Sequence, residues 1–201
     1  MLKKYVIFLT RYVEQFKHTI NGMMKKCINI GCGSDIRPFW INCDIQPANQ
    51  SIIKFDITSF EDLKWLGDQE ADLITCNHVI GYLTIAQADN FFRTCHRCLN
   101  FGGSLIIEFP DLKKLLVMLS ELDYKSETID FDYIEIIRAI YAYDNKDAML
   151  TDFDMKTYIT AWSTDYLIHR LELAGFKHLS IEPPQTHDKR LHRDTRIEAF
   201  K

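Results

Sequence analysis

The chain has 201 residues, enough for one domain with a sizeable hydrophobic core. Its 47% hydrophobic and 26% charged residues are ordinary for a soluble globular protein. The net charge of -4 disfavours a general nucleic-acid-binding protein, although the first 26 residues are strongly basic. No apolar run approaches the roughly 20 residues of a membrane-spanning helix, and the run at 5–9 is too short for a signal-peptide core. We therefore expect a cytoplasmic protein.

The first 25 residues are predicted to form an amphipathic helix. Apolar residues such as Tyr5, Leu9 and Phe16 recur at helical spacing, and Asn21-Gly22 is expected to end the helix. This helix either packs on the rest of the domain or, because it is basic, lies on an anionic membrane surface or a partner.

Residues 26–201 are predicted to form a single α/β domain, because short apolar segments alternate with helical patterns. The first five predicted strands are 27–30, 41–44, 52–56, 71–76 and 104–109. Several lack polar alternation, which is typical of strands buried on both faces of a parallel sheet. A helix at 85–99 separates the last two of these strands.

The second half of this domain contains an interruption at 111–160. Two helical patterns, 112–122 and 131–143, predict a helical lid inserted after the fifth strand. Ser163 is then expected to cap a helix that Gly175 ends. Strands at 178–181 and 195–200 are expected to form an antiparallel pair.

The six cysteines lie mostly in apolar runs, which predicts reduced, buried thiols in a cytosolic protein rather than a disulfide framework. Cys95-His96-Arg97-Cys98 has the spacing of metal ligands, but no second pair stands at zinc-finger distance. We expect no metal site.

A glycine turn follows the first buried strand. Gly31-Cys32-Gly33 would let the backbone approach a ligand closely, and Asp44 ends the next strand, where a carboxylate can bind both hydroxyls of a ribose. A dinucleotide site would also need a third glycine, where this chain has Asp35, and a full helix, which Pro38 would disrupt. The pattern therefore favours another nucleoside-containing cofactor.

The order of these and later motifs resembles the class I S-adenosylmethionine-dependent methyltransferases, and most closely a subgroup of small predicted methyltransferases. The matching segments are 28–33, 40–44, 55–57, 72–80, 97–103 and 173–176. The resemblance covers about residues 26–200. It implies a Rossmann-like, seven-stranded, mostly parallel sheet with the last strand antiparallel and a helical insertion after strand five. It also implies S-adenosyl-L-methionine as the cofactor.

The resemblance implies a role for each motif. Asp44 would accept hydrogen bonds from the ribose, Asp56 would accept the adenine amino group, and Asn77 would lie near the sulfonium. The implied cofactor-binding residues are Asn29, Gly31, Cys32, Gly33, Asp44, Ile45, Asp56, Ile57, Asn77 and His78. His78 and Asp111 are the candidate catalytic bases.

Alternatives remain open for three of these side chains. Asp44 could cap a loop, Asp56 could begin an Asx-turn, and His78 could be purely structural. The chain also departs from the family at two places. Asn29 replaces a frequent acidic residue, and Gly81-Tyr82 stands where the subgroup carries Glu-His.

The predicted function is methyl transfer to a small-molecule or saccharide-type acceptor. The alternative is a catalytically weakened binding or scaffold protein that retains the fold. A basic stretch could contact an anionic acceptor or form a solvated loop: His187, Lys189, Arg190, His192, Arg193 and Arg196. We expect no nucleic-acid substrate, because acidic residues interrupt this stretch.

Overall fold

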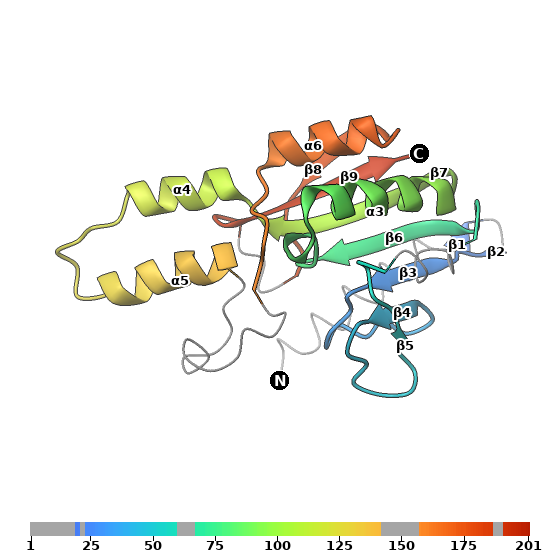
Figure 1. Cartoon of the computed structure of the whole chain (residues 1–201), viewed down its shortest axis with the longest axis horizontal. Coiled ribbons are helices and arrows are strands. Elements are labelled where there is room, and N and C mark those ends of the chain that lie inside the picture. Colours follow the sequence, from blue (N-terminus) through green and yellow to red (C-terminus); the bar gives the residue numbers. More distant parts are fainter. Residues whose placement is uncertain (1–18, 21–22, 60–66, 142–156, 187–190) are drawn as a thin grey trace.

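A seven-stranded sheet forms the centre of the computed structural model, which describes residues 19–20, 23–59, 67–141, 157–186 and 191–201 (Figure 1). Its spatial order is β5 (Ile53–Lys54), β4 (Ile41–Asp44), β3 (Cys27–Ile30), β6 (Ala71–Asn77), β7 (Leu99–Pro110), β9 (Asp194–Phe200) and β8 (Lys177–Glu182). β9 is antiparallel to both of its neighbours, and the other adjacent strands are parallel. The predicted Rossmann-like sheet is confirmed.

Two helices cover one face of this sheet, α3 (Ile85–Cys98) and α6 (Thr164–Leu173) (Figure 1). Thr84 and Gln87 form a capping box at the start of α3, and Ser163 caps α6 as predicted. Apolar side chains of both helices join those of the central strands in one large core. All six cysteines are buried and unbridged, which confirms the expected thiols.

The connection from β3 to β4 contains no helix, as Pro38 led us to expect. The Arg37 guanidinium lies 4.7 Å from the centre of the Trp40 ring and donates to Thr75 Oγ1 on β6. Trp40 also packs against Cys27, Leu73 and Ile106. This loop therefore contributes to the cover of the sheet face opposite α3 and α6.

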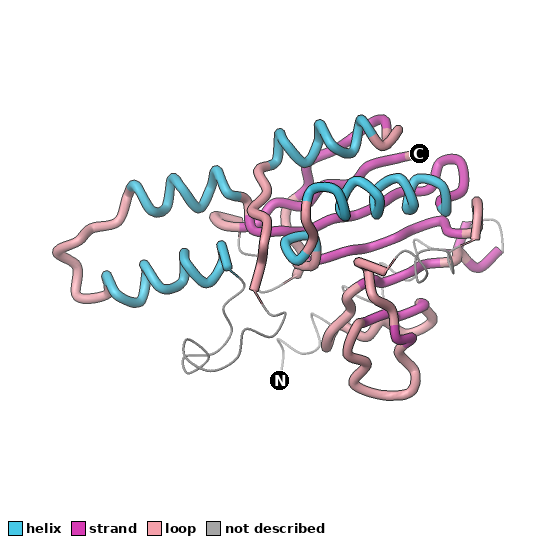
Figure 2. The backbone as a smooth tube through the Cα atoms, viewed as in Figure 1, coloured by secondary structure: helices cyan, strands magenta, loops and turns pink. Residues whose placement is uncertain are grey.

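A helical hairpin follows β7 and projects beyond the sheet (Figure 2). It consists of α4 (Leu112–Ser120) and α5 (Ile129–Tyr141), close to the predicted helical patterns. The helices pack through Leu115, Ile136 and Ala139, which form a hydrophobic cluster separate from the main core. Its use as a lid stays a prediction.

The expected helix in residues 1–25 lies mostly outside the described residues. The last two residues before the expected helix end instead form strand β1 (Thr19–Ile20), which pairs antiparallel with β2 (Met23–Met24). Asn21-Gly22, which was expected to end the helix, lies outside the described residues. Of the helices in the described part of the chain, none is long and apolar enough to cross a membrane.

Candidate cofactor and active site

The predicted site residues converge on one edge of the sheet. β3, β4, β5 and β6 are parallel, so their carboxyl ends lie at the same edge. The Gly31–Gly33 turn, Asp44, Asp56 and Asn77 occupy or follow these ends. Open α/β sheets bind their ligands at this edge.

The glycine turn and Asp44 form one hydrogen-bonded unit. Gly33 N donates to Asp44 Oδ2 at 2.8 Å, and Gln46 N donates to Oδ1 at 2.9 Å. Asp44 thus caps the loop, which was the alternative interpretation of this residue. Because each carboxylate oxygen has two lone pairs and Asp44 is partly exposed, the same group retains capacity for ribose hydroxyls.

The two glycines of the turn serve different purposes. Gly31 has φ +65°, and a Cβ there would lie 2.2 Å from Val79 Cγ2. Gly33 has φ +48°, and a Cβ there would meet nothing within 4 Å. Gly31 is therefore required for close packing on the loop after β6, whereas Gly33 borders open space in which a ligand can lie.

Asn29 and Cys32 have their contacts within the protein. Asn29 Nδ2 donates to Asp35 O at 2.7 Å, and Asn29 Oδ1 accepts from Thr75 Oγ1 at 2.9 Å. Cys32 N donates to Cys43 O, and burial followed by the charge of Asp44 raises the pKa of the Cys32 thiol. The Asn29 side chain and the Cys32 backbone therefore hold the turn in place, and direct contact of either residue with the cofactor stays a prediction.

Asp56 begins the Asx-turn that was its alternative. Its Oδ1 accepts from Thr58 N at 2.8 Å and from Thr58 Oγ1 at 2.7 Å. Beside this edge Ile57 is buried and Ile45 is 40% exposed. The adenine contact of Asp56 and the contacts of both isoleucines stay predictions.

Asn77 ends β6 with an unsatisfied side chain. Its Oδ1 and Nδ2 are both buried and have no hydrogen-bond partner among the residues that the structure describes. In the sheet it is paired with Glu108 of β7, while the preceding Cys76 is paired with Ile30, next to the glycine turn. A buried amide without partners is costly, so this position has the character of a ligand contact.

His78 lies between two buried carboxylates. Its backbone is left-handed, with φ +56°, and Nε2 is 3.7 Å from both Glu108 Oε1 and Asp194 Oδ2. Burial raises the pKa of the Glu108 carboxyl, but the His78 imidazole and hydrogen bonds from Gln185 N and Thr186 outweigh it and lower that pKa to about 2. Glu108 is thus ionised at neutral pH.

Two arginines balance these carboxylates. Arg193 donates to both oxygens of Asp194 at 2.6 and 2.7 Å, and Arg196 Nη1 lies 3.6 Å from Glu108 Oε2. The ligand atoms of His78, Glu108 and Asp194 lie within 4.8 Å of one another, as metal ligands can. Because the arginines already supply the compensating charge, we interpret the group as an ion-pair network.

This network changes the interpretation of the basic stretch. Arg193 and Arg196 were candidates for contact with an anionic acceptor, but both pair with carboxylates of their own domain. His187, Lys189 and Arg190 lie outside the described residues. Sequence reasoning missed Glu108 and Asp194, although a carboxylate inside the apolar run at 105–109 was an available signal.

The Asp111 side chain has a structural role. Its Oδ1 accepts from Lys113 N at 2.9 Å and caps α4, while Oδ2 accepts from the hydroxyls of Thr164 and Thr195. The side chain is only 4% exposed. These contacts disfavour the predicted role as a base and explain the residue as a helix cap.

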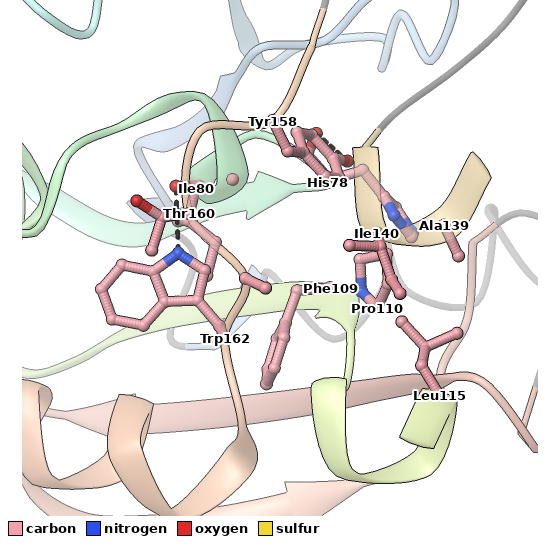
Figure 3. A pocket seen from close by; sticks show the side chains of 12 residues that line it. His78, Ile80, Phe109, Pro110, Leu115, Ala139, Ile140, Tyr158, Thr160 and Trp162 are labelled. Carbon is pink, nitrogen blue, oxygen red and sulfur yellow. Dashed lines mark hydrogen bonds between the residues drawn. The ribbon is translucent and has the colours of Figure 1, made fainter. Parts of the chain in front are cut away.

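A short segment, Tyr158–Trp162, crosses the loop after β6, and we call it the strap (Figure 3). Tyr158 Oη donates to His78 O at 2.9 Å, and Trp162 Nε1 donates to Ile80 O at 3.1 Å. Ile159 N and Thr160 N donate to Gly81 O. The strap therefore fixes the loop that begins at His78.

The strap also fills the space at position 81. A Cβ on Gly81 would lie 2.5 Å from the Tyr158 ring, and this ring contacts Tyr82 edge-on with centroids 4.7 Å apart. A narrow pocket remains between the strap, the ends of β6 and β7, and the α4–α5 hairpin (Figure 3). Phe109, Leu115 and Ile140 make its wall mainly apolar.

Comparison with known proteins finds a family match in the first part of the chain. Residues 22–107 match a family model described as "Methyltransferase domain". This segment is therefore similar to a methyltransferase domain, and the fold described above is that of S-adenosylmethionine-dependent methyltransferases. The family match and the solved structures imply S-adenosylmethionine as the cofactor, as the motif order did.

Solved structures share this methyltransferase fold at low sequence identity. An S-adenosylmethionine-dependent methyltransferase from Archaeoglobus fulgidus has a TM-score of 0.57 and 18% identity, with 98% of this chain and 94% of that chain covered. A possible histamine N-methyltransferase from Thermotoga maritima has a TM-score of 0.53 and 14% identity, with 99% and 95% covered. A possible exported protein from Bordetella parapertussis has a TM-score of 0.61 and 15% identity, with 99% of this chain and 68% of that chain covered. No curated protein sequence matches the chain.

Proposed function

We propose that this methyltransferase domain transfers the methyl group of S-adenosylmethionine to a small-molecule or saccharide-type acceptor in the cytoplasm. The main support is the unit formed by Gly33 and Asp44, in which a carboxylate stands beside an open backbone turn. That arrangement suits a ligand with a ribose at one end and a chain lying along the turn.

Bound S-adenosylmethionine supplies an electrophilic methyl group with a good sulfide leaving group. The protein's part is to hold the acceptor in line with that methyl and to exclude water. His78 is the candidate base for an acceptor hydroxyl. Its imidazole is 11% exposed, and its Nε2 lies 3.7 Å from each of two carboxylates.

The α4–α5 hairpin and the strap are the proposed walls of the acceptor site. Both border the narrow pocket beside His78, and the pocket wall contains Phe109, Pro110 and Leu115. An acceptor with an apolar part fits this wall better than one that is charged throughout.

The alternative is a binding or scaffold protein that retains the fold but has weakened catalysis. Two observations favour it: the Asp111 carboxylate is used as a helix cap, and Tyr158 fills the space beside Gly81. Neither affects the edge at which S-adenosylmethionine would bind.

Two measurements separate these proposals. Calorimetry with S-adenosylhomocysteine should give saturable binding, and its absence would contradict the cofactor site. Release of labelled methyl groups should then be measured against a panel of sugars, phenols, amines and carboxylic acids. Transfer to at least one class supports the enzyme, whereas binding without any transfer supports the scaffold.

A further inference from the structure

The α4–α5 hairpin buries little of its own apolar surface. It projects beyond the sheet, and its hydrophobic cluster is separate from the main core and has Leu115, Ile136 and Ala139 as its buried members (Figure 2). Helices of nine and thirteen residues gain most of their stability from packing of an apolar face. The remaining apolar surface of the hairpin is therefore a candidate for contact with another chain.

This surface forms one side of the hairpin. The two helices run antiparallel (Figure 1), and one step along a right-handed helix turns the side chain by about 100°. In two antiparallel helices, one step beyond each buried contact position leads to the same side, and spacings of three or four residues extend that side along each helix. We call the resulting set the hairpin face: Leu112, Leu116, Leu119, Ile129, Tyr133, Ile137 and Ile140.

The hairpin face is uncharged and open to solvent. Leu116 is 52% exposed and Tyr133 is 44% exposed, and the other members are partly buried. With about 100 Å² for each half-exposed side chain and about half of that for each of the others, one copy offers about 450 Å². An apolar patch of this size on a protein surface is often functional.

The charges at the two ends of the hairpin indicate what can cover this face. Residues 121–132 form its tip and contain five acidic residues and one lysine, so an anionic membrane would repel it. At its base, Lys113 pairs with Asp165, and Lys114 donates to backbone carbonyls. A second copy turned end to end would bring each acidic tip to the base of the other hairpin and keep the two tips apart.

We propose that two copies of this chain associate through the hairpin face, with their hairpins antiparallel and packed as a four-helix bundle. The contact is two-fold symmetric, so the same patch serves both copies, and the patch has no charge that would meet its own counterpart. The two faces with their rims bury about 1,000 Å², the lower limit for a specific interface, which corresponds to a weak dimer with a Kd of about 10 μM. This inference goes beyond the proposed function and does not depend on it.

Sedimentation velocity of the full chain between about 1 and 200 μM should show a monomer–dimer equilibrium in the wild type. Leu116→Glu and Tyr133→Glu each place a charge on the hairpin face and should raise the dimer Kd at least about 10-fold. Val117→Glu and Phe131→Glu are the matched controls, because these residues are 53% and 65% exposed on the same helices but lie outside the hairpin face. The controls should change the Kd less than about twofold.

A charge-swap experiment tests the antiparallel arrangement. Position 116 is the middle of α4, so it should lie beside position 116 of the second copy. Leu116→Glu and Leu116→Lys should each be mostly monomeric at about 20 μM, whereas their mixture should form a mixed dimer. Absence of the mixed dimer would contradict this arrangement.

Three results would overturn the proposal as a whole. The first is a wild-type chain that stays monomeric at about 200 μM, which would mean that another segment or another protein covers the face. The second is equal weakening of the dimer by the control variants. The third is a wild-type monomer that cosediments with phosphatidylserine vesicles while Leu116→Glu does not, which would assign the face to a membrane.

Discussion

At the scale of single residues, the Asp44 carboxylate caps a loop and is also the proposed ribose ligand. It holds Gly33 N and Gln46 N, and it remains partly exposed at the ligand edge. Capping of the loop is therefore compatible with the proposed ribose contact, for which the cap would position the carboxylate.

Asp44→Ala is expected to weaken S-adenosylhomocysteine binding by about 10- to 100-fold, because hydrogen bonds to a charged acceptor are lost. Calorimetry measures this directly. Asp44→Asn keeps the shape and part of the hydrogen bonding, so it should lie between Asp44→Ala and the wild type. Unchanged affinity in Asp44→Ala would rule out the ribose contact.

Glu108 predicts how stability depends on pH. The pKa of its carboxyl falls from the ordinary 4.5 to about 2 in the folded protein, so the ionised form stabilises the fold. This contribution is fully present above about pH 4.5 and is lost as pH falls through about 2, with a magnitude of about 3 kcal/mol. Urea unfolding of wild type and Glu108→Gln across this range measures it.

The difference in unfolding free energy between wild type and Glu108→Gln should shrink steadily below pH about 4.5. Glu172→Gln, at an exposed position on α6, is the control and should show no such trend. A constant difference between wild type and Glu108→Gln at all pH values would show that ionisation of Glu108 is not the cause.

At the scale of elements, the strap and the loop after β6 depend on each other. Two backbone N–H groups and two side chains of the strap donate hydrogen bonds to backbone carbonyls of that loop. Gly81 leaves room for the Tyr158 ring. This contact joins segments about 80 residues apart in the chain.

Gly81→Ala should destabilise the protein by about 1–3 kcal/mol, because its Cβ would overlap the Tyr158 ring. Chemical unfolding measures the loss. Tyr158→Ala in the Gly81→Ala background should cost less than in the wild type, since the overlap is gone. Strictly additive losses would mean that the two residues do not interact.

The regular elements were largely predictable because their signals are local. The strands at Cys27–Ile30 and Ile41–Asp44 match the apolar runs residue for residue, and Pro38 correctly excluded a helix between them. Contacts between distant segments were not predictable. Asp111 resembled a catalytic carboxylate, but its role as a cap involves Thr164 and Thr195 from other elements.

The sequence could not show which charged side chains pair with one another, because such contacts also depend on the folded structure. Arg193 and Arg196 belong to a stretch that was interpreted as a basic loop. In the structure Arg193 pairs with Asp194, and Arg196 pairs with Glu108. The pairing of Thr19–Ile20 with Met23–Met24 was also not indicated by the helical spacing of apolar residues in the first 20 positions.

At the scale of the whole molecule, the cofactor edge is expected to be linked to global stability. A ligand that binds only the folded state at 100 times its Kd stabilises it by about 2.7 kcal/mol. For a domain of this size that raises Tm by about 5–10 °C. Calorimetric melting with S-adenosylhomocysteine measures the shift, and adenine alone should give much less. No shift at saturating S-adenosylhomocysteine would contradict the cofactor site.

The position of β9 determines when this site can exist. β9 lies between β7 and β8 in the sheet although it follows both in the chain. During synthesis, those two strands emerge first and must each present an unpaired edge until β9 fills the gap. Since β9 also begins with Asp194, the charge network around His78 is completed in the same step. A ribosome-bound chain that stops short of residue 194 would therefore contain the Gly31–Gly33 turn but lack the carboxylate of Asp194 beside His78.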